Sequence, residues 1–434
     1  MNALAVTGGR VLHPDGRVSE ADVLIDADAG RIEAVGEDVT AGREIARMLD
    51  AEGGLVMPGL VNGHTHVSMT LLRGYADDKP LESWLREDIW PVEAELTDDD
   101  IAAGAELGIL EMIRSGTTTF ADMYFSMDRV AEVVERAGVR ARLGRGVVAV
   151  GKEEAEARAD LEGSLEFART YDGAADGRIR TAFMPHSLTT VPENLLTEGI
   201  ELAAEDDLWV HLHANETTDE VEPIVEKHGV RPLEYAADRG ALGPDRFLAH
   251  GVHVDGTETE LLAETDTSVI HCPASNMKLA SGIAPVQRLR EAGVTVGIGT
   301  DGAASNNDLD LFDELRDAAM VGKIGADDAS AVPAAAVVEM ATSDGADAIG
   351  LPGGRIETGA AADLIVVDLE APHLTPAHDV VSHLAYAVRG SDVRHTVCDG
   401  TVLMRDREVT TLDAATVMDR AAEHAADLVA RAEE

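Results

Sequence analysis

Short apolar runs alternate with helical patterns of apolar and polar residues through the middle of the chain. Between about residues 58 and 350, eight runs read as strands, and each precedes a segment that can form a helix. Eight strand–helix units predict an α/β protein with a (β/α)₈ barrel, the TIM barrel. A doubly wound open sheet is the alternative, but no Gly-x-Gly-x-x-Gly pattern follows the first strand. The predicted strands are 60–62, 117–121, 141–148, 179–184, 208–211, 247–249, 268–270 and 294–298.

Both ends of the chain have a different pattern. Strand-like segments at 3–6, 23–25 and 31–35 are separated by turn residues, and the segments 363–368 and 393–404 are similar in character. The pair Asp399-Gly400 is a hairpin turn signal within the last of these segments. An amphipathic helix is predicted from about Asp413 to the end of the chain.

The 434-residue chain carries a formal net charge of −46, although 45% of its residues are hydrophobic. This apolar content argues against disorder, and so acidic a chain without a Lys/Arg cluster is not expected to bind nucleic acid. Only five of its 35 basic residues are lysine. Dispersed acidic residues suit a cytoplasm of very high salt, where the Debye length falls to about 3 Å at 1 M. We therefore expect a halophilic protein rather than an ordinary acidic one.

Cysteine content and apolar run lengths bear on the compartment. Two cysteines, Cys272 and Cys398, make no disulfide framework and fit a reducing environment. The N-terminal residues lack the pattern of a signal peptide, and no apolar run approaches the roughly 20 residues that span a membrane. We expect a cytoplasmic protein with no membrane partner.

Polar residues gather where the predicted strands end. His186, His250 and Asp301 each follow a different strand, and two further strands are followed by the pairs His64 and His66, and His213 and Glu216. In a (β/α)₈ barrel the carboxyl ends of all strands meet at one rim, which is where active sites form. The sequence therefore predicts a site built from histidines and carboxylates at this rim.

The spacing of the histidines favours a metal site. His64 and His66 are two residues apart, so on extended backbone both imidazoles point to the same side. A catalytic divalent metal takes three or four such ligands and keeps a position open for water. His213 and Asp301 are the candidates to complete the set, and a carboxylate beside metal and water can accept the water's proton.

One of these assignments has an alternative. His211 and His213 face the same way in an alternating strand, so either could bind metal. We choose His213, because Glu216 then lies three residues further on, at the end of the strand. A buried carboxylic acid near the metal can donate a proton to the substrate.

Several segments resemble the amidohydrolase superfamily, namely 57–66, 210–217, 249–253 and 299–307. The last of these, with 271–276 and 282–286, resembles the 5′-methylthioadenosine/S-adenosylhomocysteine deaminases in particular. The resemblance covers essentially the whole chain. It implies a barrel at 58–350 and a small β-sandwich formed by 1–57 and 351–434, with the terminal helix attached to the latter segment.

The resemblance also implies roles at the metal. His64, His66, His213 and Asp301 would hold one divalent ion, usually zinc, although iron and manganese suit the same ligands. Glu216 would protonate the ring nitrogen beside the amino-bearing carbon, and His250 would polarise the attacking water. No lysine stands at the end of the fourth strand, so a bridging carboxylated lysine and a second metal are not expected.

Further residues match substrate contacts of the family. His186 would face the substrate, Trp84 would pack on the purine or sugar, and Glu93 would bind the ribose hydroxyls. Arg145 matches a basic residue of the family near the amino-acid tail of S-adenosylhomocysteine, and Arg158 aligns near a second such residue. The substrate would be 5′-methylthioadenosine, S-adenosylhomocysteine or a related nucleoside, deaminated by a protein that is a dimer or tetramer. The alternatives are a deaminase or chlorohydrolase of another heterocycle, such as a triazine or a guanine-like ring, and a catalytically silent scaffold.

Overall fold

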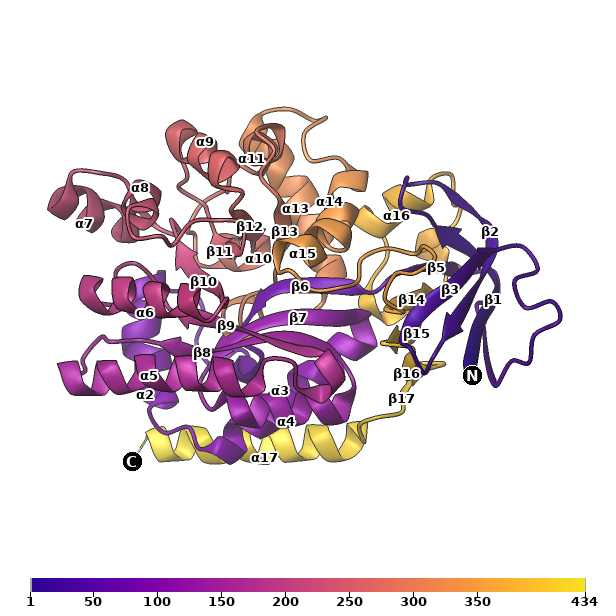
Figure 1. Ribbon diagram of the computed structural model, residues 1–434, viewed down its shortest axis with the longest axis horizontal. Helices are drawn as coiled ribbons and strands as arrows, with labels where there is room; N and C mark the ends of the chain where they lie inside the picture. Colours follow the sequence, from indigo (N-terminus) through magenta and orange to yellow (C-terminus); the bar gives the residue numbers. More distant parts are fainter. Residues whose placement is uncertain (1, 434) are drawn as a thin grey trace.

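A parallel eight-stranded barrel and a nine-stranded mixed sheet stand side by side in the computed structural model, which describes residues 2–433 (Figure 1). Residues 1 and 434, the outermost positions of the two expected terminal segments, lie outside this range. Every predicted barrel strand is present, and the strands follow one another around the barrel in chain order. They are β6 (Leu60–Thr65), β7 (Thr117–Tyr124), β8 (Arg140–Val147), β9 (Ile179–Pro185), β10 (Trp209–Ala214), β11 (Arg246–His250), β12 (Ser268–His271) and β13 (Val296–Ile298).

Helices connect the barrel strands, as the alternating pattern predicts. Their apolar faces and the outward-facing residues of the strands form one large buried core. Four short helical segments after β6 precede the first long helix; they are η1 (Val67–Leu72), α1 (Leu81–Trp84), η2 (Leu85–Ile89) and α2 (Trp90–Glu93). The other helices up to residue 350 are α3 (Asp98–Ser115), α4 (Met127–Ala137), α5 (Glu154–Tyr171), η3 (Ala175–Gly177), α6 (Glu193–Glu205), α7 (Thr218–His228), α8 (Pro232–Ala237), α9 (Gly256–Thr265), α10 (Pro273–Lys278), α11 (Val286–Glu291), α12 (Ala303–Asn306), α13 (Leu311–Ala326), α14 (Ala334–Met340) and α15 (Ser343–Ala348).

The first and last barrel strands meet at a seam that a side chain helps to close. The Asn62 amide donates to Thr300 Oγ1 at 2.8 Å, and its carbonyl oxygen accepts from the Thr300 backbone N–H at 3.0 Å. One residue further on, Asp301 N–H donates to the His64 carbonyl at 3.0 Å. A Cβ on Gly299 would lie 2.8 Å from the His64 backbone nitrogen, so only glycine permits this approach. The seam therefore sets His64 beside Asp301.

The nine-stranded sheet is built from both ends of the chain, as the resemblance implies. Strands β5 and β14 pair antiparallel at its centre, with Leu55 opposite Val367, and so join the N-terminal and C-terminal parts. The predicted turn residues Asp399 and Gly400 have φ of 49° and 72° and connect β15 to β16. The strands are β1 (Ala3–Leu12), β2 (Val18–Asp26), β3 (Arg31–Gly36), β4 (Arg47–Asp50), β5 (Leu55–Pro58), β14 (Leu364–Val367), β15 (Val393–Cys398), β16 (Thr401–Arg405) and β17 (Glu408–Val409).

Buried polar contacts fix the sheet and the last helix to the barrel. The Arg140 guanidinium of β8 binds the Asp363 carboxylate beside β14 through Nε at 3.0 Å and Nη2 at 3.2 Å. The last helix, α17 (Ala414–Ala432), packs along α3 and α2 (Figure 1), and His424 Nδ1 is 2.6 Å from the Asp100 carboxylate of α3. Its N-cap is Asp413, at the predicted start. Helix α16 (Val380–Tyr386), flanked by the short helices η4 (Pro372–Leu374) and η5 (Gly390–Asp392), packs on α13 and α14. Among residues 2–433 the structure has no helix long and apolar enough to cross a membrane.

Candidate metal and catalytic centre

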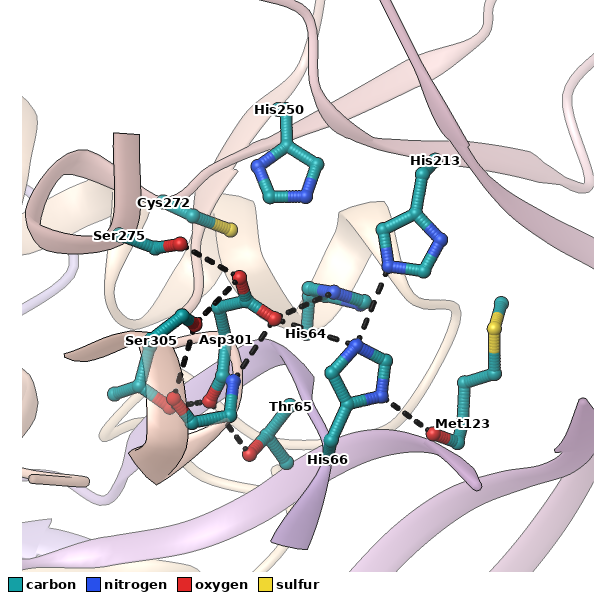
Figure 2. A network of polar contacts seen from close by, with 12 residues as sticks. His64, Thr65, His66, Met123, His213, His250, Cys272, Ser275, Asp301 and Ser305 are labelled. Carbon is teal, nitrogen blue, oxygen red and sulfur yellow. Dashed lines mark hydrogen bonds and ion pairs between the residues drawn. The ribbon is translucent and has the colours of Figure 1, made fainter. Parts of the chain in front are cut away.

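Four buried side chains converge at the carboxyl-terminal rim of the barrel (Figure 2). His64 lies on β6, His213 on β10, His250 at the end of β11 and Asp301 three residues after β13. One ligand atom of each lies within 4.8 Å of those of the others. His66 belongs to the same cluster, because its Nε2 is 3.3 Å from both Asp301 Oδ1 and His213 Nε2. The structure thus brings the predicted metal-ligating residues together.

Backbone carbonyls set the tautomers of two of these histidines. His66 Nδ1 lies 2.5 Å from the Met123 carbonyl, and His213 Nδ1 lies 2.7 Å from the His186 carbonyl. A carbonyl oxygen only accepts hydrogen bonds, so each Nδ1 carries the proton. In a neutral imidazole the other nitrogen, Nε2, is then a bare lone pair. Both Nε2 atoms face the centre of the cluster.

His211 sets the tautomer of His64 in the same way. His211 Nδ1 donates to the Phe247 carbonyl at 2.8 Å, so its Nε2 accepts from His64 Nδ1 at 2.8 Å. His64 Nε2 is left as a buried lone pair with no hydrogen-bond partner. His211 therefore stands behind His64, and of the two alternatives on β10 only His213 presents a free nitrogen to the cluster.

This donor set fits a divalent cation. Burial lowers the pKa of His64 to about 4 and that of His213 well below its ordinary value, so both rings are neutral near pH 7. His64 Nε2 and His66 Nε2 lie 3.4 and 3.3 Å from the same oxygen, Oδ1 of Asp301. Lone pairs and a carboxylate at these distances repel one another unless a cation lies between them. Imidazole nitrogens with one carboxylate oxygen are ligands that zinc accepts.

Two serines and a backbone amide orient the Asp301 carboxylate. Oδ2 accepts from Ser275 Oγ at 2.7 Å and from Ser305 Oγ at 3.0 Å, while Oδ1 accepts from the Gly302 N–H at 2.8 Å. Asp301 has φ of 61°, a conformation that aspartate tolerates better than most residues. The contacts leave Oδ1 directed at the histidines. Sequence reasoning did not select the serines, which come from α10 and α12.

Glu216 and His250 form the acid–base part of the centre. His250 Nδ1 lies 2.9 Å from Asn276 Oδ1, and its Nε2 lies 3.6 Å from Glu216 Oε2. Burial lowers the pKa of His250, but Glu216 and Asp301 more than offset this and raise it above its ordinary value. Burial raises the pKa of Glu216, to which Ser281 donates at 3.3 Å. Both groups can thus carry a proton under conditions where His64 and His213 are neutral.

Comparison with known proteins identifies the family of this centre. The model of the amidohydrolase family matches residues 55–403. The chain belongs to the amidohydrolase family. The matched range includes β6 to β13 and every residue of the cluster.

Full-length relatives carry more specific names. A 5-methylthioadenosine/S-adenosylhomocysteine deaminase of Haloarcula marismortui is 67% identical over 100% of both chains. A 5′-deoxyadenosine deaminase of Methanosarcina acetivorans is 46% identical over 97% of this chain and 96% of its own. The crystal structure of an adenosine deaminase from Xanthomonas campestris with bound zinc has a TM-score of 0.93 and 38% identity, covering 98% of each chain.

Three residues predicted to contact the substrate lie in the segments that follow β6 and β9. The ring of His186 is 4.6 Å from that of His213, and its Nδ1 is 3.1 Å from Thr190 Oγ1. Trp84, on α1, is buried and donates from Nε1 to the Ala76 carbonyl at 3.0 Å. Glu93, on α2, is half-buried and accepts a hydrogen bond of 2.6 Å from the Tyr124 hydroxyl. Tyr124 was not selected from the sequence.

Arg145 and Arg158 of the amidohydrolase do not contact the cluster. Arg145 extends from β8 toward α5; its side chain is 42% exposed, and its Nη2 lies 3.5 Å from Asp160 Oδ1. Arg158 lies on the outer side of α5 and pairs with Glu198 of α6 at 2.7 Å. A role for either arginine at the substrate tail stays a prediction.

Proposed function

We propose that this protein hydrolytically removes the amino group from the adenine ring of a 5′-substituted adenosine. The products are the inosine analogue and ammonia, and 5′-methylthioadenosine and S-adenosylhomocysteine are the first candidate substrates. The observation that carries the proposal is a buried carboxylic acid, Glu216, beside a cluster of imidazole lone pairs and a carboxylate. The names of four relatives at 60 to 67% identity support this substrate class.

A single zinc ion is the proposed cofactor. Nε2 of His64, His66 and His213 and the Oδ1 oxygen of Asp301 would hold it, and these are the atoms that face one another in the structure. Zinc bound by such ligands lowers the pKa of water from about 15.7 to about 7. The zinc in the related adenosine deaminase structure supports the choice of metal.

Different side chains carry out the separate proton transfers of the proposed reaction. Asp301 accepts the proton of the attacking water, because its ionised carboxylate lies at the centre of the cluster. Glu216 donates a proton to the ring nitrogen beside the amino-bearing carbon, which makes that carbon more electrophilic. His250, held by Asn276, polarises the water. As the C–N bond breaks, the proton that Asp301 accepted passes to the departing amine, which leaves as ammonia. The hydroxyl proton on the attacked carbon returns to Glu216, which restores the acid and gives the carbonyl group of the inosine product.

Residues of the neighbouring segments would bind the nucleoside. His186 faces the base, Trp84 packs on the purine or sugar side, and Glu93 accepts hydrogen bonds from the ribose hydroxyls. A carboxylate suits the last role, because each of its oxygens accepts hydrogen bonds and a vicinal diol offers two donors.

A deamination assay in molar KCl tests the proposed function. We expect turnover of at least one of 5′-methylthioadenosine, S-adenosylhomocysteine, 5′-deoxyadenosine and adenosine, seen as the ultraviolet change from adenine to hypoxanthine with release of ammonia. Because the site needs a cation, chelation should abolish turnover and zinc should restore it. Folded, zinc-loaded protein that deaminates none of the four would contradict the proposal.

We also propose that the protein functions at high salt. The net charge of −46 requires screening, and the Haloarcula and Halobacterium relatives support the assignment. Lowering KCl from about 2 M to about 0.1 M lengthens the Debye length severalfold, so repulsion should lower Tm steeply. Circular dichroism melts across this series measure the effect, with about 2 M sucrose in low salt as a control for osmotic stabilisation. A Tm that is independent of KCl would count against this proposal.

A further inference from the structure

Tyr124 occupies a position between the metal-ligating cluster and Glu93. It is the last residue of β7 and is 5% exposed. Its ring centroid is 6.1 Å from that of His66, and its hydroxyl donates to Glu93 Oε1 at 2.6 Å. The proton transfers described above do not use it. Its hydroxyl nevertheless makes a short, charge-assisted hydrogen bond to the carboxylate expected to meet the sugar.

The same end of β7 also fixes the position of His66, one residue of the metal-ligating cluster. Met123, the residue before Tyr124, accepts the hydrogen bond from His66 Nδ1 through its carbonyl. Two consecutive residues of β7 therefore fix two different groups, His66 through the main chain and Glu93 through a side chain. The buried phenol ring is rigid, so the carboxylate is held at a set position relative to the histidines.

One carboxylate oxygen of Glu93 remains for a ligand. Tyr124 occupies Oε1, and Glu93 is half-buried on the short helix α2. Burial raises the pKa of Glu93 to about 7, while the Tyr124 hydrogen bond opposes that shift. Loss of the hydroxyl would release the carboxylate from its position and favour its neutral form, and both effects weaken an acceptor for hydroxyl groups.

We propose that Tyr124 is a positioning residue for sugar recognition, which holds Glu93 so that its free oxygen meets the ribose hydroxyls while the adenine lies at the metal-ligating cluster. This inference rests on the proposed deaminase function. It adds Tyr124 as a residue that sets the ribose site relative to the adenine site, because the end of β7 fixes both Glu93 and His66.

The test compares Tyr124→Phe with the wild-type protein on adenosine and 2′,3′-dideoxyadenosine, which differ only in the hydroxyls that Glu93 would bind. We expect kcat/KM for adenosine to fall about tenfold or more, mainly through KM, because one hydrogen bond to a charged group is lost. The value for the dideoxy nucleoside should stay within about twofold, since that substrate does not use Glu93. The zinc content should not change.

Matched variants separate positioning from a structural role. Tyr171→Phe, on α5 where the ring stacks on Phe167, should alter neither substrate. Glu93→Gln should also lose the wild-type preference for adenosine over 2′,3′-dideoxyadenosine. Its kcat/KM for adenosine should fall little further in the double variant with Tyr124→Phe, since Tyr124 acts through Glu93. Glu93→Gln also tests the inference if Tyr124→Phe does not fold.

Three results would overturn the inference. One is an equal loss on both nucleosides in Tyr124→Phe, and another is an unchanged preference for adenosine in either single variant. The third is additivity of the two substitutions. Failure of the wild-type protein to deaminate adenosine and the other nucleosides would instead remove the proposed function, and this inference with it.

Discussion

Asp301→Asn is expected to reduce kcat for nucleoside deamination at least about 10³-fold and to weaken zinc binding at the same time. The asparagine keeps the shape of the side chain and can still accept hydrogen bonds from Ser275 and Ser305. It removes the only carboxylate among the proposed metal ligands, and with it the proposed proton acceptor. Steady-state kinetics and metal analysis on the same preparation measure both effects.

Ser305→Ala is the graded control for this prediction. It removes one of the two serine hydrogen bonds to Oδ2 and leaves the charge in place. Loss of such an orienting contact typically costs about 10- to 100-fold in activity or metal affinity. An Asp301→Asn protein with wild-type activity and zinc content would contradict the assignment of Asp301 as ligand and proton acceptor.

Glu216→Gln is expected to lower kcat by about 10² to 10⁴ while the protein keeps its zinc. The amide cannot donate an acidic proton to the ring nitrogen, and Glu216 is not among the proposed ligands. The matched control is Glu220→Gln, four residues further on, where the carboxylate only accepts from the Glu216 backbone N–H at 2.9 Å. A glutamine oxygen can accept the same hydrogen bond, so a loss below about tenfold is expected. Equal losses in the two variants would contradict the role of Glu216.

The pH dependence of the reaction follows from the protonation state of Glu216. Burial raises its pKa, so the acid form persists to higher pH than for an exposed glutamate. Because the acid form is the donor, kcat should fall as pH rises through that pKa, and Glu216→Gln should lack this limb of the profile. Rates measured in molar KCl across about pH 5 to 9 show whether the limb depends on Glu216.

The barrel and its rim could be predicted from local patterns. Apolar runs that alternate with helical segments mark the barrel strands, and the histidines and carboxylates that interrupt those runs fall at strand ends. Parallel strands in a barrel share one rim, so strand ends remote in sequence meet there. The antiparallel pairing of β5 with β14 has no local signal, and only the family resemblance pointed to it.

Other features depend on contacts that no local pattern reports. Alternation along β10 puts both His211 and His213 on the inner face, and the Phe247 carbonyl decides which ring keeps a free nitrogen. Tyr124 contacts Glu93 only because the chain after β6 places α2 beside the end of β7. Arg145, on β8, pairs with Asp160 of α5, a contact that the strand pattern does not report. Spacing along one strand does not report which neighbouring element a side chain meets.

Reconstitution of metal-free protein with zinc tests the central claim most directly. The protein would be stripped by chelation in molar KCl, checked for folding by circular dichroism, and titrated with zinc while deamination of the best nucleoside is measured. The account predicts no activity without metal and a linear rise that ends at one zinc per chain, with no rise for the Asp301→Asn variant. Full activity of the folded metal-free protein, or a plateau only at two zinc ions per chain, would contradict it.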